Sequence, residues 1–108
     1  MRAAPFAKLA ELDRLIHDPS RLAILSALLG CAEADFKYLL VATGLSKGNL
    51  SSHLSKLEAA NLIEITKGYQ GKIPWTRVRL GGEGRDRVET HWRNLEAFRS
   101  NGKKTRVW

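Results

Sequence analysis

The stretch TGLSKGNLSSHLSKLEAANLIEI, residues 43–65, decides how this 108-residue chain folds. Ser46 is a favourable helix N-cap, because its hydroxyl can accept a hydrogen bond from a backbone N–H of the first turn. Apolar residues then recur at helical spacing, which predicts a helix over Ser46–Asn61 with one buried face. That face consists of Leu50, Leu54 and Leu57.

The other side of this predicted helix is small, polar and basic. A solvent-exposed helix usually mixes Glu with its Lys and avoids Gly, Asn and Ser, which are weaker helix formers. A helix that lies against phosphates and base edges instead needs close approach and amide, hydroxyl or basic donors. The pattern therefore favours DNA binding over a plain solvated face. The candidate contact residues are Lys47, Gly48, Asn49, Ser51, Ser52, His53 and Lys56.

Caps and apolar spacing predict three helices before this one. The first covers Ala7–His17. The second covers Pro19–Leu29 after the N-cap Asp18, and because it is apolar on nearly all sides we expect it at the centre of the core. The third covers Phe36–Thr43 after the N-cap Asp35.

A change of period after this helix predicts a β-hairpin. Leu62–Thr66 and Trp75–Leu80 have the pattern of strands, and the segment between them, KGYQGKIP, is too long for a tight turn. A last helix follows over about Glu83–Phe98. The candidate contact residues of the hairpin are Lys67, Tyr69, Gln70 and Lys72, with Arg77 in support. Two alternatives remain open, namely that Tyr69 packs on the hairpin and that Arg77 pairs with Glu64.

Composition and charge indicate which kinds of partner the protein can have. The formal net charge is +7, and it is uneven, since residues 1–45 are neutral while residues 46–79 carry six basic and two acidic side chains. This excess indicates a polyanionic partner, although a basic surface without a partner would look the same. The longest charge-free apolar stretch, Leu22–Ala32, is too short to span a membrane, so we expect a cytoplasmic protein that does not bind membranes.

The order of these elements is that of a winged helix-turn-helix, a mostly α fold with a small β-hairpin and the order α-α-α-α-β-β-α. LIHDPSRLAILSALL, residues 15–29, resembles the first core helix of ArsR- and MarR-like bacterial regulators. Residues 43–65 resemble their turn and recognition helix, and KGYQGKIPWTRVRL with GGEGR resembles their wing and the entry to the final helix. The resemblance covers about residues 12–98. Asn61 stands where Gly is usual, and Gly81-Gly82 stand where a Thr or Ser cap is usual.

The resemblance implies a small stand-alone regulator that binds specific double-stranded DNA as a homodimer and represses transcription. Its recognition helix would enter the major groove, with base contacts from Lys47, Asn49 and Ser52, and its wing over residues 67–74 would reach the backbone or the minor groove. We expect one domain over residues 1–98 and a basic tail over residues 99–108. The candidate dimerisation residues on the terminal helices are Phe6, Leu9, Ile16, Trp92, Leu95 and Phe98, which could instead cover the protomer's own core.

Other functions find less support in the sequence. We expect no cofactor, no metal and no enzymatic activity, because no paired metal-ligand motif, phosphate loop or catalytic constellation is present. The helix Phe36–Thr43 lacks the paired Cys common in ArsR-type metal sensors, and Cys31 is expected to be a buried apolar residue. A small-molecule effector site, if there is one, would lie between the wing domain and the dimer helices. The alternative function is an RNA- or protein-binding winged-helix module without operator specificity.

Overall fold

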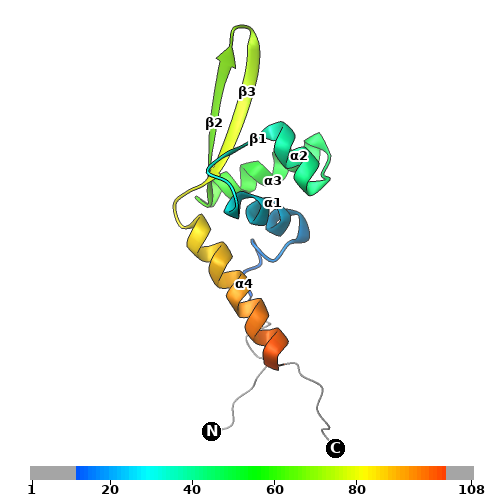
Figure 1. Ribbon diagram of the computed structural model, residues 1–108, viewed down its shortest axis with the longest axis vertical. Helices are drawn as coiled ribbons and strands as arrows, with labels where there is room; N and C mark the ends of the chain where they lie inside the picture. Colours follow the sequence, from blue (N-terminus) through cyan, green and yellow to red (C-terminus); the bar gives the residue numbers. More distant parts are fainter. Residues whose placement is uncertain (1–11, 102–108) are drawn as a thin grey trace, which may run out of the picture.

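A body of three helices carries a long β-hairpin on one side and a long C-terminal helix on the other (Figure 1). The computed structural model describes residues 12–101, and the side chains of residues 12–99. Its elements are α1 (Pro19–Leu29), β1 (Ala34–Asp35), α2 (Phe36–Thr43), α3 (Lys47–Ala59), β2 (Ile63–Gln70), β3 (Ile73–Leu80) and α4 (Gly84–Asn101).

The first two helices begin at aspartates, as the sequence predicts. The Asp18 carboxylate accepts a hydrogen bond from the Arg21 backbone N–H at the start of α1, at 2.9 Å. The Asp35 carboxylate accepts one from the Tyr38 N–H at the start of α2, at 2.7 Å. Gly44 ends α2 in the left-handed conformation, with φ of 70°, which costs glycine little. The predicted bounds of both helices are confirmed.

The helix α3 begins one residue after Ser46, whose hydroxyl oxygen accepts a hydrogen bond from the Asn49 N–H at 3.2 Å. It ends at Ala59, two residues before the predicted end. Asn61 takes the left-handed conformation, with φ of 61°, and so fills the place at which the resembling proteins usually have Gly. The last helix is longer than predicted, because α4 continues past Phe98 to Asn101.

The hairpin differs from its prediction. Strands β2 and β3 pair antiparallel from Ile63 opposite Leu80 to Gln70 opposite Ile73, so the predicted loop over residues 67–74 is wrong. A two-residue turn, Gly71-Lys72, closes the ladder. Gly71 has φ of 65°, and a glycine at the first central position is typical of the tight hairpin turn whose twist matches that of the strands. The short strand β1, which was not predicted, adds to β3 at Val78 and gives the sheet order β1-β3-β2.

The predicted helix Ala7–His17 is wrong in its described part, since residues 12–18 form turns and bends (residues 7–11 lie outside the described residues). The Asp13 side chain accepts hydrogen bonds from the backbone N–H groups of Leu15 at 3.0 Å and Ile16 at 3.4 Å. Such local bonds compete with helix formation. Pro19 also disfavours a helical conformation at the residue before it.

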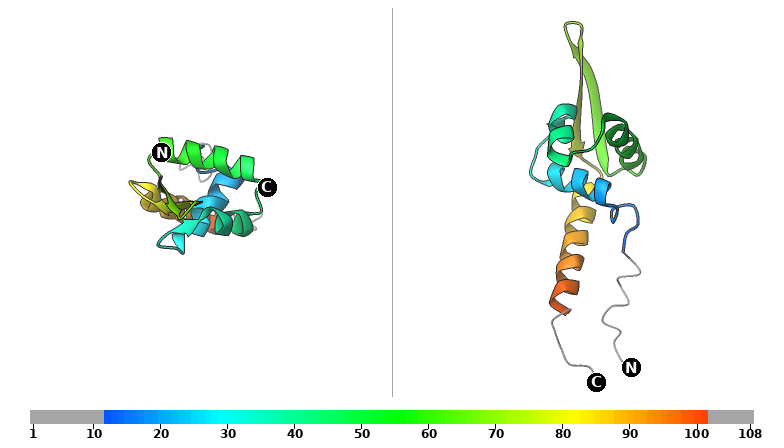
Figure 2. Two further views of the ribbon diagram at one scale, coloured as in Figure 1. Left: turned by 90° about the horizontal axis from the view of Figure 1, so that it is seen from above. Right: turned by 90° about the vertical axis from the view of Figure 1, so that its right-hand side faces the viewer.

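One apolar core joins all these elements. The helix α1 crosses the body between the hairpin base and α4, and the view from above in Figure 2 shows α2 and α3 on either side of it. Ile16 is only 1% exposed and belongs to this core. The remaining buried side chains are Ile24, Leu25, Leu28, Ala34, Leu39, Leu50, Leu54, Leu57, Leu62, Ile63, Val78 and Val88.

Candidate nucleic-acid interface

The helix α3 has one apolar and one polar face. Its three leucines are at most 3% exposed, as predicted, because they pack into the core beneath the helix. The outer face carries no acidic side chain from Lys47 to Lys56. Among the predicted contact residues, His53 is half-buried. The others are exposed, namely Lys47, Gly48, Asn49, Ser51, Ser52 and Lys56.

The wing, which is the β2–β3 hairpin, places Lys67 close to α3. Paired residues of an antiparallel ladder share a face, so Lys67 and Thr76 lie on the same side of the wing as the core pair Ile65 and Val78. A hollow of about 120 Å³ separates this side from α3. It is lined by Phe36, Ser51, Leu54, Ser55, Ile65, Lys67 and Thr76, with no acidic residue among them. The structure therefore brings the predicted residues Ser51 and Lys67 together.

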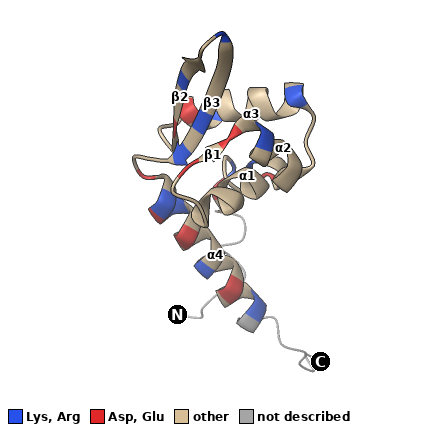
Figure 3. Ribbon diagram, turned by 45° about the horizontal axis from the view of Figure 1, so that its top comes forward, with Lys and Arg blue, Asp and Glu red and all other residues tan. Residues whose placement is uncertain are grey.

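Tyr69 follows Lys67 on the same face of the wing and is 75% exposed. The alternative in which it packs on the hairpin is therefore wrong. Gln70 and Lys72 are exposed at the tip. Figure 3 shows basic residues along both strands of the wing.

Arg77 lies on the opposite face of the wing. Its guanidinium stacks over the Trp75 ring, 4.3 Å from the ring centroid, and its Nε is 4.0 Å from a carboxylate oxygen of Glu33. It does not pair with Glu64, because that carboxylate binds Arg79 at 2.8 Å. The Trp75 indole in turn covers Gly68, where a Cβ atom would clash with the ring. Arg77 thus stands apart from the side of the wing that faces α3.

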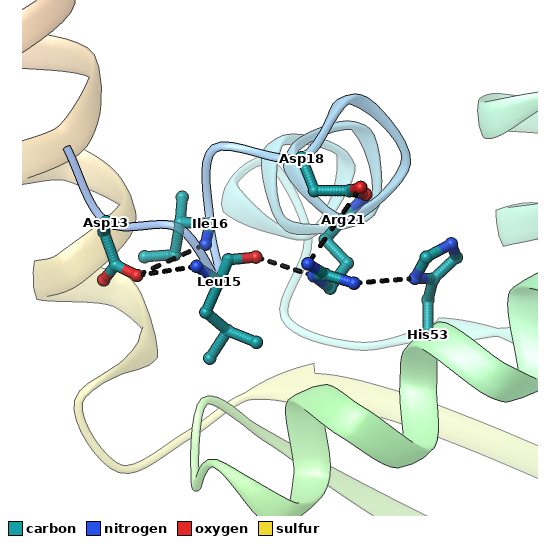
Figure 4. Close-up of polar contacts among 6 residues, drawn as sticks. All are labelled: Asp13, Leu15, Ile16, Asp18, Arg21 and His53. Carbon is teal, nitrogen blue, oxygen red and sulfur yellow. Dashed lines mark hydrogen bonds and ion pairs between the residues drawn. The ribbon is translucent and has the colours of Figure 1, made fainter. Parts of the chain in front are cut away.

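Arg21 is a residue of this region that the sequence did not indicate (Figure 4). It lies on α1, and its Nη1 is 3.3 Å from Nδ1 of His53 on α3. The N-cap Asp18 lies beside it, with 4.0 Å between carboxylate and guanidinium. The backbone N–H of Arg21, together with the charges of Arg21 and His53, holds the pKa of Asp18 below its ordinary value, although partial burial opposes this.

Comparison with known proteins identifies this arrangement. The model of the family called winged helix DNA-binding domain matches residues 20–98, which include all of α1 except Pro19 and most of α4. The chain belongs to this winged-helix DNA-binding domain family. The predicted fold class is thereby confirmed, with the added strand β1 and the corrections given above.

Individual proteins are similar to this winged-helix protein in sequence or in fold. An uncharacterized protein of Methanocaldococcus jannaschii is 32% identical over 73 residues, which cover 67% of this chain and 78% of that protein. A solved transcriptional regulator homologue of Pyrococcus horikoshii OT3 superposes with a TM-score of 0.83 at 26% identity, over 90% of this chain and 98% of that one. The Salmonella typhimurium protein ytfH superposes with a TM-score of 0.68 at 19% identity, over 93% and 91% of the two chains.

The predicted dimerisation residues differ in where they lie in this winged-helix domain and in how exposed they are. Phe6 and Leu9 lie outside the described residues, and Ile16 lies inside the protomer's own core instead of on its surface. Trp92 is 45% exposed on α4, where its indole N–H donates to the Ser26 hydroxyl at 3.1 Å. Leu95 and Phe98 are half-buried along the same helix.

The structure also bears on the predictions for Cys31, for metal binding and for membrane-spanning helices. Cys31 is half-buried instead of fully buried, and its thiol donates to the Ala27 carbonyl oxygen at 3.4 Å. Among the described residues, no three His, Cys, Asp or Glu side chains are grouped so that they could hold a metal ion. None of the helices in residues 12–101 combines the length and the hydropathy of a membrane span.

Proposed function

We propose that the protein is a transcriptional regulator that binds a specific sequence of double-stranded DNA. The observation that carries this proposal is the exposed, acid-free outer face of α3 beside Lys67 of the wing. Amide, hydroxyl and basic donors on a surface helix match the acceptors that DNA offers in its major groove and on its phosphates.

Each part of this surface has a proposed role. The N-terminal half of α3 lies at the base edges, where Asn49 can read adenine through two hydrogen bonds and Lys47 can read guanine. Ser52 also reaches a base. The phosphate contacts come from Ser51, His53 and Lys56. The wing residues Lys67, Tyr69, Gln70 and Lys72 contact the backbone or the minor groove, while Arg77 supports the wing through its stack on Trp75.

We further propose that the protein acts as a homodimer and represses transcription. The support is α4, which extends away from the body on the side opposite to the wing (Figures 1 and 2). Its Trp92 is 45% exposed. A two-fold dimer through this helix would present two copies of α3 to half-sites about one helical turn, roughly 34 Å, apart. A dimer bound across a promoter would exclude other proteins from the same groove.

A small-molecule effector belongs to the same proposal. A hollow of about 640 Å³ lies between α4 and the turn over residues 12–13, a volume typical of small-molecule sites. It offers acidic, basic and aromatic groups, among them Asp13, Arg87, His91 and Phe98. An effector bound there would touch both α4 and the N-terminal turn.

The test is selection of fragmented genomic DNA on the purified protein, followed by titration of the best fragment at two salt concentrations. We expect a short inverted repeat, bound about 10³-fold or more over random duplex. Uniform recovery of all fragments with steep salt dependence would contradict the proposal and favour the RNA- or protein-binding module.

Two variants separate base reading from phosphate binding. Asn49→Ala should weaken binding to the selected site more than binding to random duplex, because it removes a base contact. Lys72→Ala should weaken both about equally and lower the salt slope by about one unit, because it removes one phosphate contact. Equal weakening of both duplexes by Asn49→Ala would remove Asn49 from the base-reading set.

A further inference from the structure

Arg21 joins three parts of the molecule through one side chain (Figure 4). Its Nε donates to the Leu15 carbonyl oxygen at 2.7 Å, and its Nη1 lies 3.3 Å from Nδ1 of His53. The Arg21 side chain is only 14% exposed, so it lies beneath the outer face of α3. Asp18 balances its charge at 4.0 Å. A side chain so enclosed is poorly placed to bind phosphate itself.

The contact with Arg21 determines which nitrogen of His53 carries the proton. A guanidinium has only donors and stays protonated, so His53 Nδ1 must be the acceptor in this contact. The neutral ring then carries its proton on Nε2. This second nitrogen lies on the far side of the ring from Arg21 (Figure 4). It is therefore available as a donor to an acceptor outside the body.

We propose that Arg21 is a positioning residue for DNA binding, which holds the His53 ring in the Nε2–H form and directs that N–H toward a DNA phosphate. The inference rests on the proposed function, because it names how one phosphate contact of α3 is prepared. Arg21 reaches no DNA in this proposal. It acts by fixing the tautomer and the orientation of the ring before DNA arrives, which lowers the ordering cost on binding.

Arg21 is itself held in place by hydrogen bonds, which keep its guanidinium beside His53. Its Nε is bound to a backbone carbonyl of the turn over residues 12–18, and its own backbone N–H is bound to Asp18. Lysine could not replace it, because a single ammonium lacks the planar fork that serves the Leu15 carbonyl and the His53 ring at the same time.

The first experiment observes the His53 tautomer in the free protein, without DNA. Long-range ¹H–¹⁵N correlation at about pH 8, where histidine is ordinarily neutral, should show the His53 proton on Nε2 and an unprotonated Nδ1. The His53→Gln spectrum assigns the signals. In Arg21→Met the Nδ1 signal should move as the ring exchanges between tautomers. A proton resident on Nδ1, or unchanged ¹⁵N shifts in Arg21→Met, would overturn the proposal.

The second experiment is a double-variant cycle on the selected DNA fragment. Loss of one hydrogen bond to a charged acceptor weakens binding by about tenfold or more, so His53→Ala and Arg21→Met should each approach that loss. The double variant should bind no more weakly than His53→Ala alone. If the double variant instead lost affinity by the product of the two single losses, Arg21 would not act through His53.

Two matched variants control for charge and for folding. Arg93→Met removes the same charge from an exposed position on α4, where Arg93 contacts Thr90 of its own helix, and should leave DNA affinity nearly unchanged. Arg21→Lys keeps the charge and should still lose affinity and the fixed tautomer, which settles the question if Arg21→Met does not fold. Failure of the unsubstituted protein to bind any duplex would refute the proposed function, while the tautomer result would stand separately.

Discussion

Gly84 opens α4 at a point where the backbone leaves no room for a side chain. The residue is buried, and a Cβ atom there would clash with the carbonyl oxygen of Leu62 at the end of the α3–β2 connection. The clash involves backbone, which cannot rotate away as a flexible side chain could. This close approach fixes where α4 leaves the body.

We expect Gly84→Ala to lower the free energy of unfolding by about 2–4 kcal/mol, because either α4 or the Leu62 backbone must move. Urea denaturation followed by circular dichroism measures the change. Gly30→Ala is the matched control, since φ is −88° there and the nearest atom to its Cβ lies at 4.0 Å. That variant should change stability by no more than about 1 kcal/mol. Equal stability of the two variants would mean that the α4 junction is not tightly packed.

Gly48 lies within α3, but the fold of this helix does not explain why a glycine stands there. A Cβ atom built there meets nothing within 4 Å, and the residue is exposed inside a helix. Glycine costs a helix about 0.5–1 kcal/mol relative to alanine. A close approach by a partner from outside the chain would account for this cost, in agreement with the proposed DNA contact.

Gly48→Ala should therefore raise the free energy of unfolding by about 0.5–1 kcal/mol and at the same time weaken binding to the selected DNA. The helix gains from alanine, but the added methyl group occupies space that a base or phosphate would need. Thermal unfolding and a DNA titration on the same preparation measure both effects. A gain in stability with unchanged DNA affinity would show that Gly48 does not mark the contact.

The elements predicted correctly are those whose ends are specified locally. The bounds of α1 and α2 follow from Asp18, Asp35 and Gly44, each of which acts on its own neighbours. The hairpin loop is predicted wrongly because two glycines and a proline indicate an open loop, whereas cross-strand pairing continues through Gly68 as far as Gln70. The strand β1 was missed because two residues carry no period of their own and pair only once β3 is in place.

The candidate interface was predictable in composition and less so in geometry. The outer face of α3 follows from helical spacing alone, since the leucines determine which side is buried. The position of Lys67 beside Ser51 depends on strand register, and the contact of Arg21 with His53 joins residues far apart in the chain. The sequence predicted Ile16 at a dimer surface because it assumed a helix that the Asp13 turn replaces.

Side-chain contacts join the N-terminal turn over residues 12–18 to α4. Asp13 forms an ion pair with Arg87, and His17 Nδ1 lies 3.2 Å from Nε2 of the buried His91. Burial would raise the pKa of Asp13, but the hydrogen bond and charge of Arg87, with backbone N–H groups, outweigh it and lower the pKa. Burial first, and then the charge of His17, lower the pKa of His91, while the Asp13 carboxylate opposes this.

This arrangement makes stability depend on pH. The folded protein binds a proton at His91 only below the ordinary value of 6.5, whereas the unfolded chain binds it near that value, so stability falls as the pH drops through 6.5. When the pH is lowered from about 7.5 to about 5.5, the free energy of unfolding should fall further in the unsubstituted protein than in His91→Gln. The reason is that glutamine does not titrate. Urea denaturation at both pH values measures the difference. Equal losses in the two proteins would mean that His91 does not contribute.

The tight turn at Gly71-Lys72 has a mechanical consequence for the wing. The last cross-strand pair that packs on the apolar core is Ile65 with Val78, and the paired strands continue beyond it to Gln70. At about 3.3 Å per residue, this leaves a hydrogen-bonded ladder of about 16 Å that projects beyond the core. A flexible loop could adapt to many distances from α3, whereas a hydrogen-bonded ladder holds the tip of the wing at one distance from α3. In the proposed complex, a duplex held between α3 and the tip has to match that distance or bend to it, so the bending stiffness of the duplex would contribute to the choice of DNA sequence.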